Sequence, residues 1–521
     1  MDLELSAKAR AHARRVGAPW LEGAVLELEP GPHLFLDWRF VLPGELGLIG
    51  PYWGTEAEDP IPLRLWNNDE WKDRPVEARY VPRDVPQGIR IVTQKAEKGE
   101  PFAEGEAPGS RIIRDEGVYR TWYRHRASEN MGVLHYAESP DAYAWGEAVE
   151  CTFDWSACPE AGGHERPEIF VDPTAAEEQC FKMFFRAGIG GTEAEKRRIV
   201  EEFRRTRSEE IYPTHGASLD RLSGMYGAVS ADGVQWKGID GPLAIHYSDT
   251  TNVVHYDRRL EKYVWYGRCN WYYGRRCIGR AETDDFRRWP GPELLVWPGT
   301  DLHPTDDWYT NSKTQYPGAV DHQLMFPSLY HHTDDTSELR LFSSPDGLVW
   351  SEVPGGAVLE TGPPGAWDEG CIFGGHDLIA LGDGQVALPY SGYLYPHKYP
   401  RNQFSFKSHI AYALWPEGRL GALEAEEAGN FTTLPLAGEG RRLLLNTQTR
   451  RAGHVLVEVA DREGRPLPGR SFAEADPIVG DYAAREVTWR GETDLKIGTG
   501  QSFMLRFRLR AAKLFAFELA P

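Results

Sequence analysis

The sequence predicts an all-β protein, a five-bladed β-propeller followed by a C-terminal β-sandwich. Three observations predict this fold. A short motif recurs four times with identical internal spacing, strand-like runs precede every copy, and the spacing of strand-like runs changes after residue 429. Repeated units of three or four short strands are typical of propellers. We place the propeller at residues 1–427 and the sandwich at residues 428–521.

The repeated motif reads Ser or Thr, any residue, Asp, three residues, Trp. Its copies begin at Ser139, Ser230, Thr283 and Ser344, and two of them contain Asp-Gly, a strong hairpin signal. In such a turn the Asp accepts backbone N–H groups and the Trp covers the hairpin. The alternative is four unrelated turns. We expect structural hairpin tips, so the motif carboxylates are not catalytic candidates: Asp141, Asp232, Asp285 and Asp346.

Before the repeats, residues 6–16 predict a short helix, residues 24–28 a strand, and residues 41–105 long loops. The apolar run at residues 34–40 predicts a strand that is a candidate for closing the propeller ring, which would remove exposed sheet edges. A charged stretch at about residues 191–211 predicts a helical insertion.

Within the propeller, hydrophobic runs bounded by turn residues predict the blade strands. They lie at residues 111–113, 119–124, 133–136, 168–171, 180–186, 225–229, 252–256, 263–268, 276–280, 324–330, 339–342, 377–380, 386–390 and 409–414. The sandwich strands are expected at residues 431–436, 442–446, 454–459, 484–489, 502–509 and 514–519.

The composition limits the possible partners. The net charge is −20 and no basic stripe interrupts it, which argues against nucleic acid or an anionic membrane as a partner. No run is long enough for a membrane span. Aromatic residues make up 12% of the chain, with 18 Trp, and flat apolar rings suit carbohydrate, although propeller cores also use many aromatics. A homo-oligomer is possible.

The six cysteines show no metal-binding spacing, and we expect thiols in a reducing compartment. The N-terminus has no apolar segment of the signal-peptide type. We therefore expect a cytoplasmic protein that binds no cofactor and no metal.

In a propeller the innermost strands bring residues that are distant in sequence to a common funnel. Polar residues at the starts of these strands are therefore the candidate site. The substrate-binding candidates are Trp38, His164, Arg166, Asn252, Asn311, Tyr316, Asp368, Glu369 and His376. The catalytic candidates are Asp37, Glu168 and Asp249, because glycoside cleavage needs a protonated acid and a second carboxylate. Each candidate has a structural alternative as a capping, packed or ion-paired residue.

These features resemble the five-bladed glycoside hydrolases of families 32 and 43, and the resemblance covers most of residues 30–521. Arg166-Pro167-Glu168 is similar to the Arg-Asp-Pro of family 32, and Asp249-Thr250-Thr251 occupies the place of its Glu-Cys-Pro. Leu36-Asp37-Trp38 stands where the family has Asn-Asp-Pro-Asn. The chain looks most like a divergent bacterial group within this set.

The resemblance implies a glycoside hydrolase acting on a furanoside or a small oligosaccharide. Asp37 would be the nucleophile or base, Asp249 the general acid, and Glu168 would stabilise the transition state. One alternative is a non-catalytic carbohydrate-binding propeller. Another is a metal-assisted sugar lyase or isomerase, with ligands drawn from the histidines His164, His246, His255 and His376.

Overall fold

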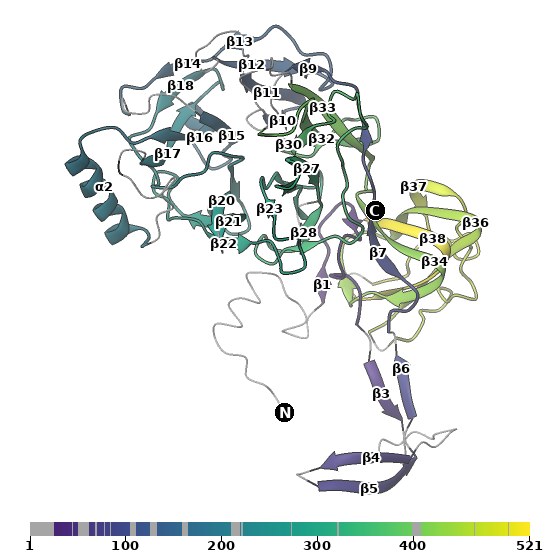
Figure 1. Ribbon diagram of the computed structural model, residues 1–521. Coiled ribbons are helices and arrows are strands. Elements are labelled where there is room, and N and C mark those ends of the chain that lie inside the picture. The colour runs from purple at the N-terminus through teal and green to yellow at the C-terminus, as the bar shows by residue number, and fades with distance from the viewer. Residues whose placement is uncertain are drawn as a thin grey trace. The chain divides into compact units, whose positions relative to one another are not determined.

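The computed structural model is almost entirely β (Figure 1). It describes residues 25–43, 45–49, 62–67, 70–77, 79–83, 85–104, 111–124, 133–158, 165–209, 219, 222–271, 274–319, 322–398, 408–462, 464–498 and 500–521. The chain forms two compact units. Unit 1 combines residues 1–92 with residues 421–521, and unit 2 comprises residues 93–420. The predicted helix at residues 6–16 lies outside the described residues.

Unit 2 consists of successive sheets that follow one another around the unit in Figure 1, and they are antiparallel except for the parallel pairing of Thr152–Asp154 with Gln235–Gly238 in the second sheet. The first sheet contains β10 (Arg111–Asp115), β11 (Val118–Arg124), β12 (Leu134–Ser139) and β13 (Val149–Glu150). The second contains β15 (Glu165–Val171), β16 (Phe181–Gly188), β17 (Ser223–Ser230), β18 (Gln235–Gly238) and β14 (Thr152–Asp154). The third contains β19 (Val253–Asp257), β20 (Lys262–Trp271), β21 (Arg275–Thr283) and β22 (Glu293–Val296).

The next stretch of unit 2 alternates between two small sheets. One contains β23 (Asp306–Trp308), β26 (Ser328–His331) and β27 (Thr336–Leu339). The other contains β24 (Lys313–Gln315), β25 (Gln323–Met325), β28 (Phe342–Ser344) and β29 (Ser351–Glu352). Pro327 lies between β25 and β26 and cannot donate a ladder hydrogen bond, which fits the break between them.

The last sheet of unit 2 joins the two ends of the unit. It contains β30 (Cys371–Gly374), β31 (Ile379–Ala380), β32 (Gln385–Tyr393) and β33 (Ser408–Pro416), and it is completed by β8 (Glu97–Lys98) and β9 (Ala103–Glu104). The prediction that residues 34–40 close the ring is wrong. In that segment β2 (His33–Leu34) pairs with the C-terminal strand β38 (Met504–Ala520) of unit 1.

The four motif copies are hairpin tips, as predicted. Each copy begins at the last residue of β12, β17, β21 or β28. In the second copy, Asp232 Oδ1 accepts hydrogen bonds from the backbone N–H groups of Val234 and Gln235, both at 2.8 Å. The Trp236 indole donates to the Gly233 carbonyl at 3.0 Å. The equivalent bonds in the first copy lower the pKa of Asp141. These carboxylates are therefore committed to holding turns.

The predicted helical insertion is α2 (Glu193–Thr206), which begins with a capping box between Thr192 and Glu195. Phe203 is its buried residue, and Ile199 and Val200 pack against the hydrophobic core of the second sheet. The helix is therefore attached by a narrow apolar stripe, with its charged residues in solvent.

Unit 1 is built from both ends of the chain. Its main sheet has the order β37 (Asp481–Glu486), β36 (Arg442–Ala460), β38, β34 (Gly421–Thr432) and β7 (Arg90–Thr93). The N-terminal part therefore belongs with the C-terminal strands, in contrast to the predicted division at residue 427. The separate predicted strands at 442–446 and 454–459 form one long strand with a register shift between Thr449 and His454.

Residues 41–105 are not simply loops. They contain β3 (Glu45–Ile49), which pairs with β6 (Arg79–Arg83), and β4 (Pro62–Asn67), which pairs with β5 (Glu70–Glu77). These strands contain Pro and charged residues, so they lack the alternating pattern by which strands are predicted.

None of the helices among the described residues is long and apolar enough to cross a membrane.

Candidate active site

Side chains from four sheets of unit 2, and from the segment between β30 and β31, meet at a group that we call the inner-strand cluster: Arg111, Glu168, His255, Lys313, His376 and Asp377. The Arg111 guanidinium binds the Glu168 carboxylate through Nη1 and Asp377 through Nε, at 2.5 Å to Oδ2. His376 Nδ1 lies 2.8 Å from Glu168 Oε2. Glu168 is completely buried, whereas the Asp377 side chain is 21% exposed. Glu168 is therefore a completely buried carboxylate whose charged partner is the Arg111 guanidinium.

The backbone brings these groups together. Arg111 and His376 form a parallel bridge, so the first sheet and the last sheet meet at this level. Asp377 has a φ of +58°, which is uncommon for a residue other than glycine and is most tolerated by Asn and Asp. Such strained positions cluster at functional sites. The turn aims the Asp377 carboxylate back at Arg111.

Two further members of the cluster form a buried pair of bases. Lys313 Nζ lies 3.3 Å from His255 Nε2. Burial lowers the pKa of Lys313 to about 7, and burial together with the nearby Lys313 charge holds the pKa of His255 well below its usual range. Lys313 is therefore a lysine that can be a neutral amine near neutral pH.

A second group lies near the starts of β19 and β24, and we call it the Tyr309 cluster: Tyr247, Asp249, Arg268, Arg276, Asp307, Tyr309 and His332. Arg268 Nη1 binds Asp249, and its Cζ lies 4.5 Å from the centre of the Tyr309 ring. The Tyr247 hydroxyl donates to Asp249 Oδ2 at 3.0 Å. The Asp249 side chain is 36% exposed. Asp249 is thus an accessible carboxylate whose negative charge Arg268 stabilises.

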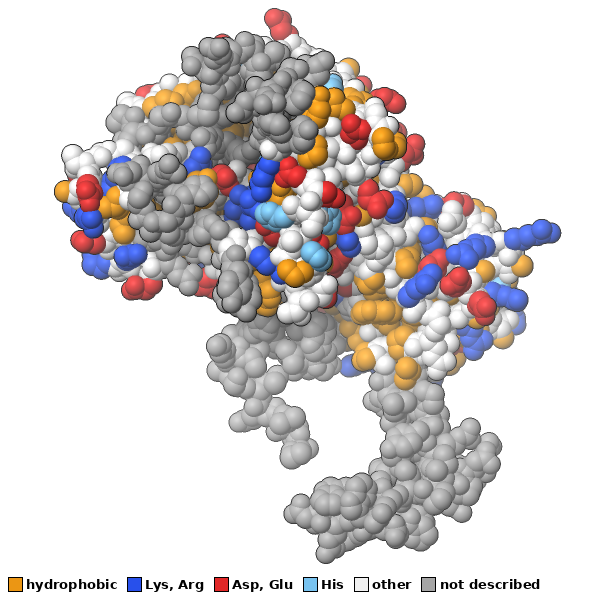
Figure 2. Space-filling view, viewed as in Figure 1, with side chains coloured by type: hydrophobic (Ala, Val, Ile, Leu, Met, Phe, Trp, Pro, Cys, Tyr) orange, Lys and Arg blue, Asp and Glu red, His pale blue; other side chains and the backbone are white. Residues whose placement is uncertain are grey.

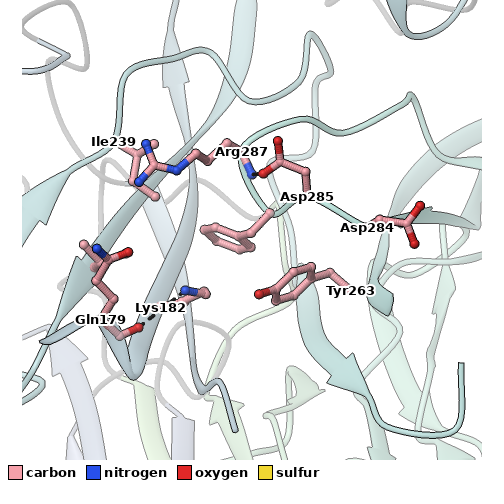
Figure 3. A pocket seen from close by; sticks show the side chains of 9 residues that line it. Gln179, Lys182, Ile239, Tyr263, Asp284, Asp285 and Arg287 are labelled. Atoms are coloured by element: carbon pink, nitrogen blue, oxygen red, sulfur yellow. Dashed lines mark hydrogen bonds between the residues drawn. The ribbon is translucent and has the colours of Figure 1, made fainter. Parts of the chain in front are cut away.

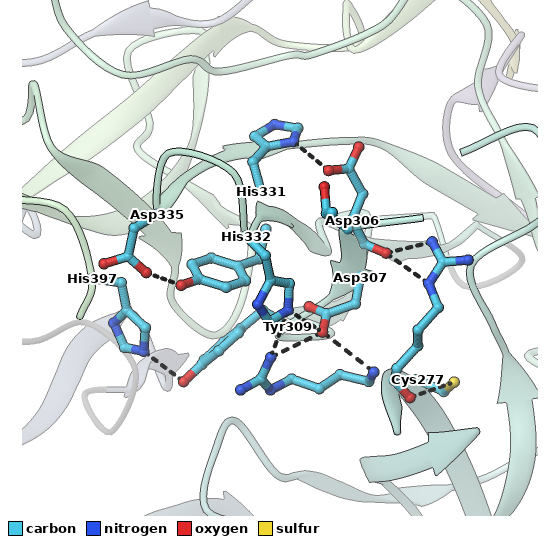
Figure 4. Close-up of polar contacts among 12 residues, drawn as sticks. Cys277, Asp306, Asp307, Tyr309, His331, His332, Asp335 and His397 are labelled. Carbon is cyan, nitrogen blue, oxygen red and sulfur yellow. Dashed lines mark hydrogen bonds and ion pairs between the residues drawn. The ribbon is translucent and has the colours of Figure 1, made fainter. Parts of the chain in front are cut away.

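The other half of the Tyr309 cluster is a buried acid with an exposed histidine (Figure 4). Asp307 Oδ2 lies 2.9 Å from Arg276 Nη1 and 3.0 Å from His332 Nε2. The Asp307 side chain is 2% exposed and that of His332 is 36% exposed. The Arg276 guanidinium also lies against the Tyr309 ring, with its Cζ 4.7 Å from the centre. Arg268 and Arg276 therefore connect the two aspartates through one aromatic ring.

An aromatic group supports Tyr309. Its ring contacts Tyr330, Phe373 and His397, and its hydroxyl lies 2.7 Å from His397 Nε2. Figure 2 shows basic, acidic and histidine side chains gathered on this face of unit 2, over β23 and β27. Aromatic rings beside charged groups are suited to sugars, which have both apolar C–H faces and hydroxyl groups.

Two predicted site residues lie in unit 1. Asp37 is in a turn, where its carboxylate pairs with Arg39 at 2.6 Å, and Trp38 is 47% exposed. The prediction that Asp37 lies in an inner strand of the first blade is wrong, because the strand it follows pairs with β38. His164 lies outside the described residues, as does the side chain of Arg166.

The other predicted binding residues of unit 2 are engaged within the protein. Asn252 and Asn311 donate to backbone carbonyls, and the Tyr316 hydroxyl accepts from the Gly418 N–H. Asp368 is buried and pairs with Lys98 at 2.6 Å, and Glu369 accepts from the Gly365 N–H. Glu168 and His376, which were both predicted to belong to the site, lie next to each other. Asp249 is the predicted residue with the accessible carboxylate.

Six charged residues of these clusters were not among the predicted site residues: Arg111, Arg268, Arg276, Asp307, Lys313 and Asp377. His332 was not predicted either. All of the six except Asp377 lie in strands, where a buried charge is rare without a partner. A charged residue inside an apolar run singled out Asp37, but Arg111 stands at the start of Arg-Ile-Ile-Arg-Asp and Lys313 lies in the polar stretch Asn-Ser-Lys-Thr-Gln, so neither shows that signal. Which partners they meet depends on contacts between sheets that no local pattern contains.

A separate pocket of about 210 Å³ lies between the second and third sheets (Figure 3). Its lining includes Lys182, Tyr263, Phe286 and Arg287. The Lys182 ammonium is 3.2 Å from the buried Asp172 carboxylate, so this lysine is already paired. The charged clusters described above, not this pocket, bring together the groups suited to catalysis.

Among the described residues, no group of three or more His, Cys, Asp or Glu side chains could hold a metal ion.

No protein-family model matches the chain, and no curated protein matches it in sequence. Solved structures similar to it include an α-L-arabinofuranosidase from Lactobacillus brevis, with 16% identity, a TM-score of 0.41, and coverage of 60% of this chain and 92% of that chain. A thermostable family-43 glycoside hydrolase has 14% identity and a TM-score of 0.39, with 64% and 96% covered. An N-acetylgalactosamine deacetylase from F. plautii has 13% identity and a TM-score of 0.38, with 74% and 97% covered. One of these solved structures is thus a family-43 glycoside hydrolase, from a group that the sequence resembles.

Proposed function

We propose that the chain is a glycoside hydrolase whose active site is the Tyr309 cluster. In this proposal the sheets of unit 2 are the blades of a five-bladed β-propeller, and the C-terminal strands of unit 1 form a β-sandwich. The observation that carries the proposal is the connection of two aspartates, Asp249 and Asp307, through two arginines on one tyrosine ring. Substrate would be a furanoside or a small oligosaccharide.

Asp249 acts as the nucleophile or base. Contact with Arg268 stabilises its negative charge, which suits attack on the anomeric carbon or removal of a proton from the attacking water, and does not suit proton donation. This assignment differs from the sequence prediction, which gave Asp249 the role of general acid.

His332 carries the proton to the leaving oxygen. Asp307 orients its imidazole through Nε2, and the exposed side of the ring faces solvent, where a substrate can reach it. Glu168 is buried and touches only protein groups, so it acts as a positioning residue that fixes Arg111 and His376. Asp37 has no role in this proposal.

Substrates with different leaving groups distinguish the role of Asp249 from that of His332. Nitrophenyl glycosides need little help from an acid, whereas unactivated oligosaccharides need protonation of the leaving oxygen. We expect Asp249→Asn to lower kcat roughly 100- to 10,000-fold on both substrates. His332→Gln should lower kcat mainly on the oligosaccharide. Asp37→Asn is the matched control and should retain full activity.

The outcomes distinguish the parts of the proposal. Equal activity of the parent, Asp249→Asn and His332→Gln would show that the site lies elsewhere. A parent that cleaves none of a panel of pyranosides and furanosides, but binds a sugar in titration calorimetry, would support the second candidate function, a carbohydrate-binding module. The observation favouring that candidate is that both aspartates are already neutralised by arginines.

A further inference from the structure

A pair of cysteines lies on the two strands that carry the arginines of the Tyr309 cluster. Cys269 in β20 and Cys277 in β21 are directly opposite each other in the antiparallel ladder. Opposite residues in such a ladder point to the same face of the sheet. Both are in the thiol form, and they are 9% and 1% exposed. Two thiols therefore face the same side of one hairpin at the closest cross-strand position.

We propose that Cys269 and Cys277 form a reversible cross-strand disulfide, which makes this hairpin an oxidation site. Opposite Cα atoms lie about 4.5–5.5 Å apart, within the roughly 4.4–6.8 Å range of disulfides. Opposite Cβ atoms are about 4.5–5.5 Å apart, slightly more than the roughly 3.5–4.5 Å that a disulfide needs. The strands must therefore move together slightly, and a strained disulfide of this kind is readily reduced.

The present contacts of the two sulfurs allow this change. Cys269 Sγ lies 3.5 Å from the Pro292 carbonyl oxygen, and Cys277 Sγ lies 3.5 Å from the Arg275 carbonyl oxygen. Thiol–carbonyl hydrogen bonds are weak, so rotation about χ1 loses little. Gly279, next to Cys269 Sγ, has no side chain to resist the movement.

A peroxide can oxidise the two thiols to the disulfide in two steps. One thiolate attacks the peroxide O–O bond, gives a sulfenic acid and releases water or an alcohol. The second thiol then attacks that sulfur, forming the S–S bond and releasing water. The pair loses two electrons and two protons, and the peroxide is reduced. A dithiol reverses the change by exchange.

The position of the pair gives the modification a consequence. Arg268 and Arg276 immediately precede the cysteines, and strand alternation places them on the opposite face of the same hairpin. These arginines bind Asp249 and Asp307. Drawing β20 and β21 together therefore acts on the strands that hold both aspartates, whatever reaction the site performs.

The sequence permits a direct test with the full chain. Trypsin cleaves after Arg268, Arg275, Arg276 and Arg280, so the two cysteines fall in separate peptides, residues 269–275 and residues 277–280. After treatment of the native protein with hydrogen peroxide, non-reducing digestion and mass spectrometry should show these peptides joined, with loss of two hydrogens. Dithiothreitol should separate them.

The controls keep the test falsifiable. Cys269→Ser must abolish the linked peptide, and Cys371→Ser, at another buried thiol, must leave it unchanged. Cys180 is more exposed and serves as an internal measure that peroxide reached the protein. Oxidation of Cys180 without any linkage of Cys269 to Cys277, or linkage only in denaturant, would overturn the proposal.

Discussion

The indole Nε1 of Trp122, in the first sheet of unit 2, donates a 2.7 Å hydrogen bond to the carbonyl oxygen of Gly233, at the hairpin tip of the second sheet. The same carbonyl also accepts from Trp236 of its own hairpin. Two other tips repeat the arrangement. The Tyr266 hydroxyl donates to Gly347 at 3.0 Å, and the Tyr412 hydroxyl donates to Ala142 at 2.7 Å. In three of the four copies, the residue after the motif Asp therefore links its sheet to a neighbouring one.

Replacing Trp122 should weaken this link. We expect Trp122→Phe to lower the free energy of unfolding by about 1–3 kcal/mol, because the Gly233 carbonyl loses one of its two indole donors and the smaller buried ring leaves unfilled space. Urea unfolding followed by circular dichroism measures the change. Trp297→Phe, at a side chain that is 53% exposed, is the matched control and should cost less than about 0.5 kcal/mol. Equal losses in the two variants would contradict a role for the link.

The motif aspartates should affect stability and leave catalysis unchanged. Asp346 Oδ1 accepts from the N–H groups of Leu348 and Val349 at 2.8 and 2.9 Å, and the residue is buried. We expect Asp346→Ala to cost about 1–3 kcal/mol, since two partly buried backbone N–H groups lose their acceptor. Asp284→Ala, at an exposed neighbour of another motif copy, should be nearly neutral. A loss of kcat per folded molecule in Asp346→Ala would show that the motif does more than hold the turn.

Removing the cation from the inner-strand cluster should be strongly destabilising. Arg111→Met leaves Glu168 completely buried beside Asp377 without the guanidinium that binds both. Breaking a buried pair from one side typically costs about 3–5 kcal/mol. The double variant Arg111→Met/Glu168→Leu should recover part of this loss in thermal or urea unfolding. If the stability losses of Arg111→Met and Glu168→Leu, measured separately, simply add in the double variant, the two residues are not coupled.

Lys313 should make stability depend on pH. Its pKa is about 7 in the folded chain because it is buried, and about 10.4 in an unfolded chain. Between these values the unfolded state holds a proton that the folded state lacks, so the free energy of unfolding rises with pH. Below about pH 7 the folded state carries the whole cost of the buried ammonium, which faces Arg111, Arg280, His255, Asp257 and Asp377.

Lys313→Met removes this cost. We expect the variant to exceed the parent in stability by a few kcal/mol at pH 6, and the difference to shrink as the pH approaches 10. Comparing the two proteins at each pH cancels the titration of other groups. Lys262→Met, at a more exposed lysine, should show no such trend. A constant difference between Lys313→Met and the parent across this range would mean that Lys313 titrates normally.

Much of unit 2 could be predicted from the sequence because its strands are short, regular and closed by a repeated turn. The predicted strand at residues 180–186 is β16, and that at 386–390 lies within β32. The closing strands could not be predicted, because β8 and β9 are two residues each and carry no pattern. The assignment of residues 34–40 failed because pairing with residues 516–517 is a long-range contact.

The site was predicted less well for a related reason. A polar residue at the start of a strand can be an active group or an internal hydrogen-bond partner, and local sequence does not distinguish the two. Asn252 and Asn311 satisfy backbone carbonyls, whereas Asp249 is exposed. Arg268 and Arg276 meet Tyr309 only because the third sheet packs beside β23, and that contact exists only in three dimensions.

The order in which the two units are synthesised affects the folding of the N-terminal part of unit 1. Unit 2 is continuous in sequence, and its ends meet where the Gln94 N–H donates to the Leu420 carbonyl at 2.9 Å. Unit 1 is split around it, and its central strand β38 is synthesised after the whole of unit 2. Because domains fold as their residues emerge, unit 2 can be complete while the first 92 residues still await their partners. For that interval the N-terminal segment depends on other surfaces, or on chaperones, to stay out of aggregates.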